Sequence, residues 1–343
     1  MDSNQILQRL NELRKRKIRL IAVSNSEWYS LFKDEIRNSI AIEGVFANRK
    51  ELLDVLDRHK RTSDEKTAAI LGYFEAASTL YEYANNLYME GEFSIRVSDI
   101  RQTHTLLMRY EKQAGIYKGD LGEYRKETVV VARSAFTPLD NQYIRDFMQV
   151  YVKWINKKID DPGYDKIKLA ALSHILFETV HPFRDGNGRA GRILLSFILI
   201  GCGFINITIK GTQQHERDKY YSAMEEGDDA FEEMLREIEN GRKITTELID
   251  TYAEQSHTDK LEGLLTRGLR ESLQRLTKTE YIPHDPDAVL PLRDAARFYN
   301  YSQDYLRNLI NKGKLPGIRR GKLWYVWVRD LEQYIKDVES NHG

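Results

Sequence analysis

HPFRDGNGRAGR, residues 181–192, brings together the most varied set of reactive groups in this 343-residue chain. It holds one imidazole, one carboxylate, one carboxamide, three glycines and three arginines. Before it, apolar residues of the segment 166–180 recur at the i, i+3, i+4 intervals of a helix. After it, residues 193–204 are almost wholly apolar and indicate a buried helix. The sequence therefore predicts a loop held rigidly between two core helices.

The residue types of this loop predict a phosphate site. Gly186, Asn187 and Gly188 open the second helix, where glycines let backbone N–H groups converge at the positive end of the helix dipole. Arg189 and Arg192 lie three residues apart and are expected on one helix face, aimed at the same place. Two guanidinium groups above such a turn suit a polyphosphate. A helix-capping turn with solvated arginines is the alternative interpretation.

Two further side chains of the loop add reactivity. Asp185 can hold Mg²⁺ between phosphates, and His181 is the nearby group able to take a proton near neutral pH. Together the groups predict phosphoryl or nucleotidyl transfer to a hydroxyl. The glycines also form the pattern G-x-G-x-x-G of dinucleotide-binding sites. A helix is expected before them and no acid follows before Glu216, which excludes that type of site. The absence of a following Gly-Lys-Ser/Thr excludes a Walker A loop.

At every specified position this stretch resembles the Fic family signature, H-x-F-x-[D/E]-G-N-G-R-x-x-R. The resemblance implies a mostly α Fic fold with a β-hairpin flap, and transfer of AMP from ATP, with Mg²⁺, to a Ser, Thr or Tyr hydroxyl of a protein. The chain itself is one candidate target. The intact GNGR separates it from the related Doc kinases. The roles implied are base for His181, core anchor for Phe183, Mg²⁺ ligand for Asp185, and phosphate ligands for Gly186, Asn187, Gly188, Arg189 and Arg192.

A second Fic-like pattern lies upstream. Apolar residues recur at every fourth position from Trp28 to Ile40 and predict a helix that ends before a glycine. SIAIEG, residues 39–44, fits the inhibitory pattern [S/T]-x-x-x-E-[G/N] of Fic proteins. That resemblance implies that the acid reaches Arg192 and occupies the γ-phosphate position; a solvated surface acid is the alternative. The residues of this expected inhibitory element are Ser39, Glu43 and Gly44.

Two more elements belong to the expected catalytic region. Residues 119–138 contain a β-branched run and predict a hairpin, which resembles the Fic flap that pairs with the target as an added strand; its candidate docking residues are Val129, Val130 and Val131. An ordinary surface hairpin is the alternative. Tyr220 and Tyr221 follow the motif where Fic proteins often place a Tyr near the adenine, although tyrosines at helical spacing are also common in cores.

The C-terminal part predicts a separate module after the turn at 283–286. Two short helices, 292–298 and 303–312, precede a strand at 323–328 and a last helix at 330–338. This order resembles the excisionase and MerR-type winged helices and makes DNA a candidate partner, with a protein-docking module as the alternative. The candidate DNA contacts are six basic residues in a stretch without acids: Arg307, Lys312, Lys314, Arg319, Arg320 and Lys322.

We therefore expect four regions: an N-terminal helical region, 1–110, with the inhibitory helix at about 27–44; a Fic core, 111–240; a charged helical connector, 241–285; and a winged helix-turn-helix, 286–343. Lys+Arg and Asp+Glu are balanced at 52 each, so no overall field points to a polyanion. A single cysteine excludes an internal disulfide framework and a Cys-based zinc site. Without a signal peptide or a membrane-length apolar run, a cytoplasmic protein with no membrane contact is expected. A homodimer is one candidate assembly.

Two other functions are compatible with this sequence. One is a transcription regulator that uses a Fic domain as a nucleotide sensor, against which the intact histidine, acid and arginines of the motif argue. The other is an enzyme of the same fold that uses another nucleotide donor or removes AMP.

Overall fold

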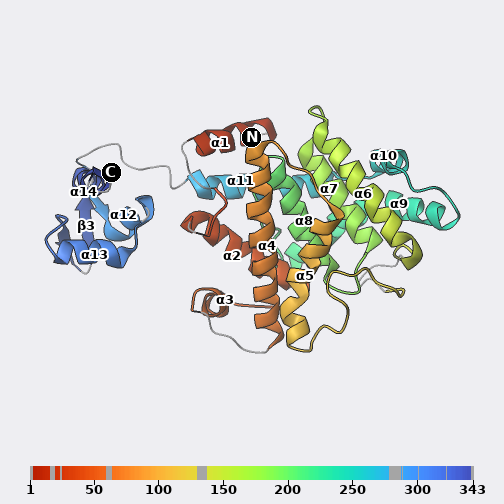
Figure 1. The fold of residues 1–343 in the computed structure, drawn as a ribbon, viewed down its shortest axis with the longest axis horizontal. Helices are drawn as coiled ribbons and strands as arrows, with labels where there is room; N and C mark the ends of the chain where they lie inside the picture. Colours follow the sequence, from red (N-terminus) through yellow and green to blue (C-terminus); the bar gives the residue numbers. More distant parts are fainter. Residues whose placement is uncertain are drawn as a thin grey trace. The chain divides into compact units, whose positions relative to one another are not determined.

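The computed structural model describes residues 3–15, 20–23, 25–58, 64–129, 137–277, 287, 289–299, 301–321 and 323–340. The chain divides into two compact units, Met1–Leu273 and Gln274–Gly343. Helices dominate both units, as the sequence predicts (Figure 1). Those that begin in the first unit are α1 (Ser3–Lys15), α2 (Ser26–Ile42), α3 (Arg49–Leu56), α4 (Glu65–Glu90), α5 (Val97–Gln113), α6 (Asn141–Asp160), α7 (Lys166–Val180), α8 (Asn187–Gly201), α9 (Gln214–Glu239), α10 (Thr246–Gln255) and α11 (Asp259–Thr277).

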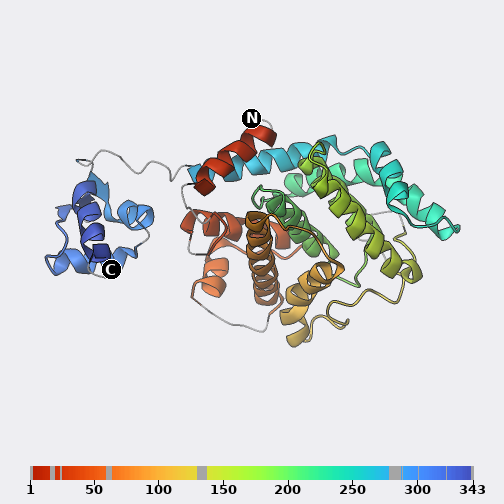
Figure 2. The same cartoon turned by 45° about the horizontal axis from the view of Figure 1, so that its top comes forward.

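Helix α8 lies in the middle of the first unit because it is apolar on every side (Figures 1 and 2). It packs against α4, α5 and α7, and α7 packs in turn against α9. Helix α4 approaches α5 closely at Gly72, where a Cβ would overlap the backbone carbonyl of Leu107. The core helices α7 and α8 therefore hold the loop between them, residues 181–186, from both ends.

Local sequence sets the ends of these helices. Asp165 caps α7 by accepting hydrogen bonds from Ile167 N at 2.7 Å and Lys168 N at 3.1 Å. Helix α2 ends at Ile42, with Glu43 as its C-cap and Gly44 in the left-handed region at φ 87°. The predicted end of this helix at Gly44 is confirmed, and Glu43 consequently stands at the helix tip.

Residues 259–273 of the segment expected to be a connector belong to the first unit and contribute to its core. Leucines recur at every fourth position of α11, at 261, 265, 269 and 273, and all four are buried. Helix α11 lies against residues 206–210: the Ser272 hydroxyl donates to the Asn206 carbonyl at 3.3 Å, and Lys210 Nζ pairs with Glu271 Oε2 at 2.9 Å. One buried leucine stripe thus packs α11 against the first unit despite the many charges on its other faces.

The second unit has its own core and a three-stranded antiparallel sheet, ordered β1–β3–β2. Its elements are β1 (Val289–Pro291), α12 (Leu292–Phe298), α13 (Gln303–Asn311), β2 (Ile318–Arg320), β3 (Leu323–Trp327) and α14 (Val328–Ser340). In the β2–β3 wing, Ile318 faces Tyr325 and Arg319 faces Trp324. The apolar face of α13 supplies Leu306 and Leu309 to the core. The predicted order of two helices, wing and last helix is confirmed, and α12 has the predicted bounds.

Of the predicted flap hairpin, residues 119–138, the stretch 130–136 lies outside the described residues, and with it Val130 and Val131; the described parts, 119–129 and 137–138, form no strand. Val129 is described and lies in no strand. Lys322 of the wing is also outside the described part. Among the helices in the described ranges, none combines the length and the apolar character that crossing a membrane requires.

The packing of α11 leads to a stability prediction. We expect Leu269→Ala to lower the free energy of unfolding of the first unit by about 2–5 kcal/mol, because it leaves a cavity in a fully buried position. Leu264→Ala, at a half-buried position of the same helix, is the matched control and should cost clearly less. Urea denaturation of both variants measures the difference. Equal, small effects would support the view of 241–285 as a connector.

Candidate active site

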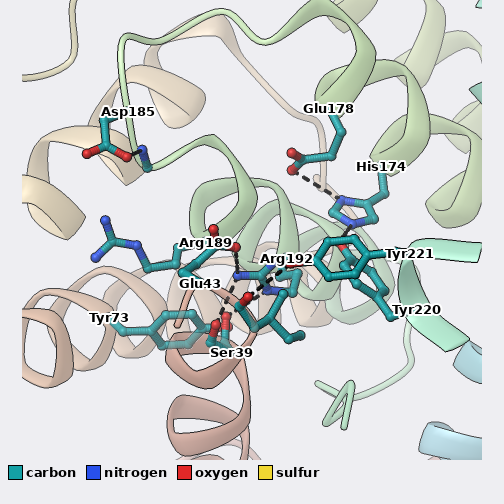
Figure 3. Close-up of polar contacts among 12 residues, drawn as sticks. Ser39, Glu43, Tyr73, His174, Glu178, Asp185, Arg189, Arg192, Tyr220 and Tyr221 are labelled. Atoms are coloured by element: carbon teal, nitrogen blue, oxygen red, sulfur yellow. Dashed lines mark hydrogen bonds and ion pairs between the residues drawn. The ribbon is translucent and has the colours of Figure 1, made fainter. Parts of the chain in front are cut away.

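The motif loop borders a cavity of about 560 Å³ in the first unit. Its walls come from the C-terminal turn of α7, the loop itself, the first turns of α8, the tip of α2 and one face of α9. Motif residues on the wall include His181, Asp185, Gly186, Asn187, Gly188 and Arg192, and Glu43 faces them from α2 (Figure 3). The structure thus gathers most of the predicted site residues around one space large enough for a small ligand.

His181 ends α7 in a left-handed conformation, with φ at 50°. Among the described residues, all others with positive φ are glycines. Its amide N donates to the Phe177 carbonyl at 3.0 Å, and its Nδ1 lies 3.2 Å from the Glu178 carbonyl. If Nδ1 carries the proton and donates it there, Nε2 keeps a free lone pair. Burial lowers the pKa of His181, so the imidazole is neutral at pH 7 and Nε2 can accept a proton.

Phe183 and Asn187 fix the loop. The Phe183 ring is fully buried and stacks on His104 with centroids 4.0 Å apart. Asn187 Oδ1 accepts from Phe183 N at 2.9 Å, and Asn187 Nδ2 donates to the Phe183 carbonyl at 2.8 Å. The Asn187 side chain therefore closes the turn, which leaves its backbone N–H as the group it can offer to a ligand.

His104 supports the loop from α5. Its Nδ1 accepts from Gly122 N at 2.9 Å, so its Nε2–H donates to the Asp185 carbonyl at 3.1 Å. Burial lowers the pKa of His104 to about 4, which keeps the ring neutral.

Arg125 is a residue that the sequence did not single out. It is 4% exposed and its guanidinium donates to backbone carbonyls on both sides of the motif entrance: His181 O at 2.8 Å, Val180 O at 3.4 Å and Leu139 O. Its own amide donates to the Pro182 carbonyl at 3.0 Å. The Val180 carbonyl belongs to the last turn of α7, whose carbonyls have no partner within the helix, and the His181 carbonyl follows it directly. An isolated arginine in an irregular segment gives no sequence signal for such a role.

The first turn of α8 offers an anion seat. The first N–H groups of a helix have no partner within the helix. The N-cap of α8 is Gly186, at φ 78°, which has no side chain that could accept from them. A Cβ atom at position 188 would overlap Glu43 Oε1, so the glycine at this position allows the close approach of that carboxylate. Asp185 beside it is exposed to the cavity and accepts from Gly186 N at 2.5 Å.

Arg192 lies buried at the centre of the inhibitory contact that the sequence predicts. Its Nη2 donates to Glu43 Oε1 at 2.6 Å and to the Ser39 carbonyl at 3.0 Å, and its Nε donates to Ser39 Oγ at 2.8 Å (Figure 3). Burial raises the pKa of Glu43, but the Arg192 charge outweighs it and holds that pKa below the ordinary value. The same pair raises the pKa of Arg192 against its burial. Glu43 and Arg192 are therefore both charged.

Arg189 differs from the sequence prediction. We expected it to face the same place as Arg192, but its guanidinium pairs with Glu111 of α5, with Nη2 to Oε2 at 3.3 Å, and it does not line the cavity. Glu111 is buried and offers a closer partner than the open cavity does. A helical spacing of three fixes the face of α8 only to within a turn, so neighbours decide where each long side chain points.

Tyr220 and Tyr221 both line the cavity from α9. The Tyr220 hydroxyl lies 2.8 Å from His174 Nε2, and the Arg192 guanidinium stands 5.8 Å from the Tyr220 ring centre. Tyr221 donates to the Ile42 carbonyl at 3.0 Å, at the end of α2. Tyr220 is buried, so its hydroxyl belongs to the wall of the cavity, whereas Tyr221 is half-buried.

Comparison with known proteins assigns both units. The description "Fic/DOC family" matches residues 94–199, and "Helix-turn-helix domain" matches residues 289–338. A probable protein adenylyltransferase of Aquifex aeolicus is 27% identical over 316 residues, which cover 90% of this chain and 88% of that protein. The protein adenylyltransferase Fic of Nematostella vectensis is 30% identical over 203 residues, 59% of this chain and 44% of that protein.

A solved structure has the same fold. A Fic domain containing signaling protein from Bacteroides thetaiotaomicron superposes with a TM-score of 0.58 at 21% identity, covering 80% of this chain and 97% of that one. This likeness supports the fold of the helical unit.

Proposed function

We propose, from the match of residues 94–199 to the Fic/DOC family, that the protein transfers AMP from ATP to a hydroxyl side chain of a protein. The relatives from Aquifex and Nematostella are named protein adenylyltransferases, which supports this assignment. The observation that carries the proposal is one cavity that joins a neutral imidazole, an open helix N-terminus and a buried arginine. A proton acceptor beside an anion seat is the arrangement that nucleotidyl transfer to a hydroxyl requires.

In the proposed reaction, His181 Nε2 accepts the proton of the target hydroxyl while that oxygen attacks the α-phosphorus. A new oxygen–phosphorus bond forms, the bond between the α-phosphorus and the α–β bridging oxygen breaks, and pyrophosphate leaves. The N–H groups at the start of α8 are the proposed donors to the phosphate oxygens. Arg189 is ion-paired with Glu111 in this structure. It can act as a further phosphate ligand only after its guanidinium leaves Glu111 and turns to the nucleotide.

Asp185 is the proposed ligand of Mg²⁺. Its carboxylate is exposed to the cavity beside the anion seat, and one carboxylate with phosphate oxygens is a donor set that Mg²⁺ commonly takes. The residues present therefore fit the ion. When bound, it would neutralise charge on the phosphates.

The rival functions predict different properties. A nucleotide sensor needs no proton acceptor, and the free Nε2 of His181 argues against it. Another donor nucleotide or removal of AMP would use the same groups. Incubation with labelled ATP, labelled GTP and an AMP-modified protein separates these alternatives directly.

We propose Glu43 as an inhibitor in cis. Its carboxylate occupies the donors of Arg192 that a terminal phosphate would need, and one guanidinium cannot clamp both. The contact lies at a helix tip, where an acid is unfavourable against the helix dipole until a cation pairs with it.

For the second unit we propose duplex DNA as the partner. Helix α13 and the β2–β3 wing carry basic residues, and the sequence from Tyr305 to Lys322 contains no Asp or Glu. Lys312 and Lys314 are exposed, whereas Arg307 already pairs with Asp304 at 3.1 Å. The match to the helix-turn-helix description supports this proposal.

The first prediction concerns the base. His181→Ala should lower AMP transfer at least 100-fold, the lower scale of general-base catalysis, while ATP binding stays close to wild type. Labelling with radioactive ATP and a separate binding titration measure the two quantities. His257→Ala, an exposed histidine that does not line the cavity, is the control. Undiminished labelling by His181→Ala would remove the assigned role.

The second prediction concerns inhibition. Glu43→Gly should raise AMP transfer, seen first as self-modification. Because the Glu43 side chain is 36% exposed, the pair is worth about 1.5 kcal/mol, the lower end for a hydrogen bond to a charged group, and the gain is on the order of tenfold. Ser39→Ala should give a smaller gain, and Arg192→Ala none. If Glu43→Gly labels no faster than wild type at saturating ATP, Glu43 is an ordinary surface acid.

The third prediction concerns DNA. Residues 286–343 should bind duplex DNA with an affinity that falls steeply with salt. Lys312→Ala with Lys314→Ala should reduce the log–log salt slope by about 0.9 for each phosphate that the protein no longer neutralises. Lys336→Ala, on α14 outside the basic stretch, should leave the slope unchanged. A fragment that shifts no duplex at low salt would favour the protein-docking alternative.

A further inference from the structure

Glu178 is an acid in a helix that is otherwise almost entirely apolar on its inner faces. It lies on α7, lines the cavity and has 18% of its side chain exposed. Its Oε1 is buried and accepts no hydrogen bond from the described residues. The dashed line from Glu178 to His174 in Figure 3 marks an ion-pair distance of 4.0 Å. Gly191 of α8 makes room for it, since a Cβ there would overlap Glu178 Oε1. A buried oxygen without a donor costs about 1–3 kcal/mol, so its presence at a cavity wall points to a ligand.

The surroundings keep this carboxyl neutral. Burial is the main cause that raises the pKa of Glu178 to about 8; Arg192 opposes it and Glu43 adds a smaller increase. His174 Nδ1 lies 4.0 Å from Glu178 Oε1, too far for a hydrogen bond, and burial lowers the pKa of His174 to about 3. At pH 7 the Glu178 carboxyl is therefore mainly protonated and neutral. Its O–H group can donate one hydrogen bond, and its oxygens can accept others. Such a group stands beside phosphates without repelling them.

The position along α7 selects which part of a nucleotide reaches Glu178. It lies three residues before His181, a rise of about 4.5 Å along a helix. The reacting α-phosphorus must lie beside the hydroxyl that His181 deprotonates, and the ribose is joined directly to that phosphate, whereas the edge of the base lies farther away. Carboxyl groups hold ribose hydroxyls in dinucleotide sites.

We propose that Glu178 forms a ribose subsite, in which its carboxyl hydrogen-bonds the 2′- or 3′-hydroxyl of the donor nucleotide. The inference rests on the proposed function and extends it from the phosphates to the sugar. Glu178 then determines the preference for a ribonucleotide and orients the α-phosphate toward His181. It touches the nucleotide without exchanging a proton in the reaction.

The test compares ATP, 2′-deoxy-ATP, 3′-deoxy-ATP and inosine triphosphate as ligands of the full chain. Wild type should bind ATP about 5–10 times more tightly than at least one deoxy analogue, the scale of one hydrogen bond. Glu178→Leu should bind ATP as weakly as that analogue and should bind the analogue itself unchanged. Glu178→Gln keeps a donor and an acceptor and should retain most of the discrimination.

Each outcome decides one question. Unchanged sugar discrimination in a Glu178→Leu variant with wild-type melting temperature overturns the ribose subsite and leaves the proposed function intact. A variant that loses discrimination between ATP and inosine triphosphate instead would assign Glu178 to the base and also overturn it. If Glu178→Leu fails to fold, a wild type that binds ATP and both deoxy analogues equally well overturns the ribose subsite on its own. Wild type that binds no nucleotide would overturn the proposed function itself.

Discussion

The loop between α7 and α8 must present polar groups to a cavity while both of its ends are buried in apolar helices. Three features satisfy this constraint: the left-handed backbone conformation of His181, the stacking of the Phe183 ring on His104, and the two hydrogen bonds between the Asn187 side chain and the Phe183 backbone. Arg125 supplies donors for the carbonyls that the end of α7 leaves unpaired. The direction of the His181 ring and of the first α8 N–H groups depends on all of them, so the chemistry of the site is a consequence of packing.

Arg192 joins this loop to the rest of the unit. Because it is buried, its charge needs a partner at all times, and in this structure Glu43 and Ser39 provide it. A phosphate that replaces the Glu43 carboxylate would satisfy the same need. Occupation by the Glu43 carboxylate and the proposed occupation by a phosphate are thus two solutions of one electrostatic problem.

Short-range sequence patterns predicted much of this structure. The apolar periods located α2, α7 and α8, Gly44 marked a helix end, and the order of elements after 286 indicated the winged unit. The rest depends on long-range neighbours. The direction of Arg189 is set by Glu111, far away in sequence, and the leucine stripe of α11 finds its partners at 206–210. The neutral state of Glu178 also needs burial, which spacing alone does not reveal; an acid within an apolar helix was the available signal.

The way α2 is anchored limits how the proposed inhibition by Glu43 can be relieved. Two turns before Glu43, Glu35 is buried and accepts from Tyr73 at 2.9 Å, Tyr81 at 2.5 Å and Asn206 at 2.7 Å. Burial raises the pKa of Glu35 to about 7 even though these hydrogen bonds lower it. Pulling the helix away would leave three buried donors unpaired, at about 1–3 kcal/mol each. Rotating the partly exposed Glu43 side chain breaks one contact at the helix tip instead. Relief of the proposed inhibition would therefore cost least as a change of the tip, with the helix left in place.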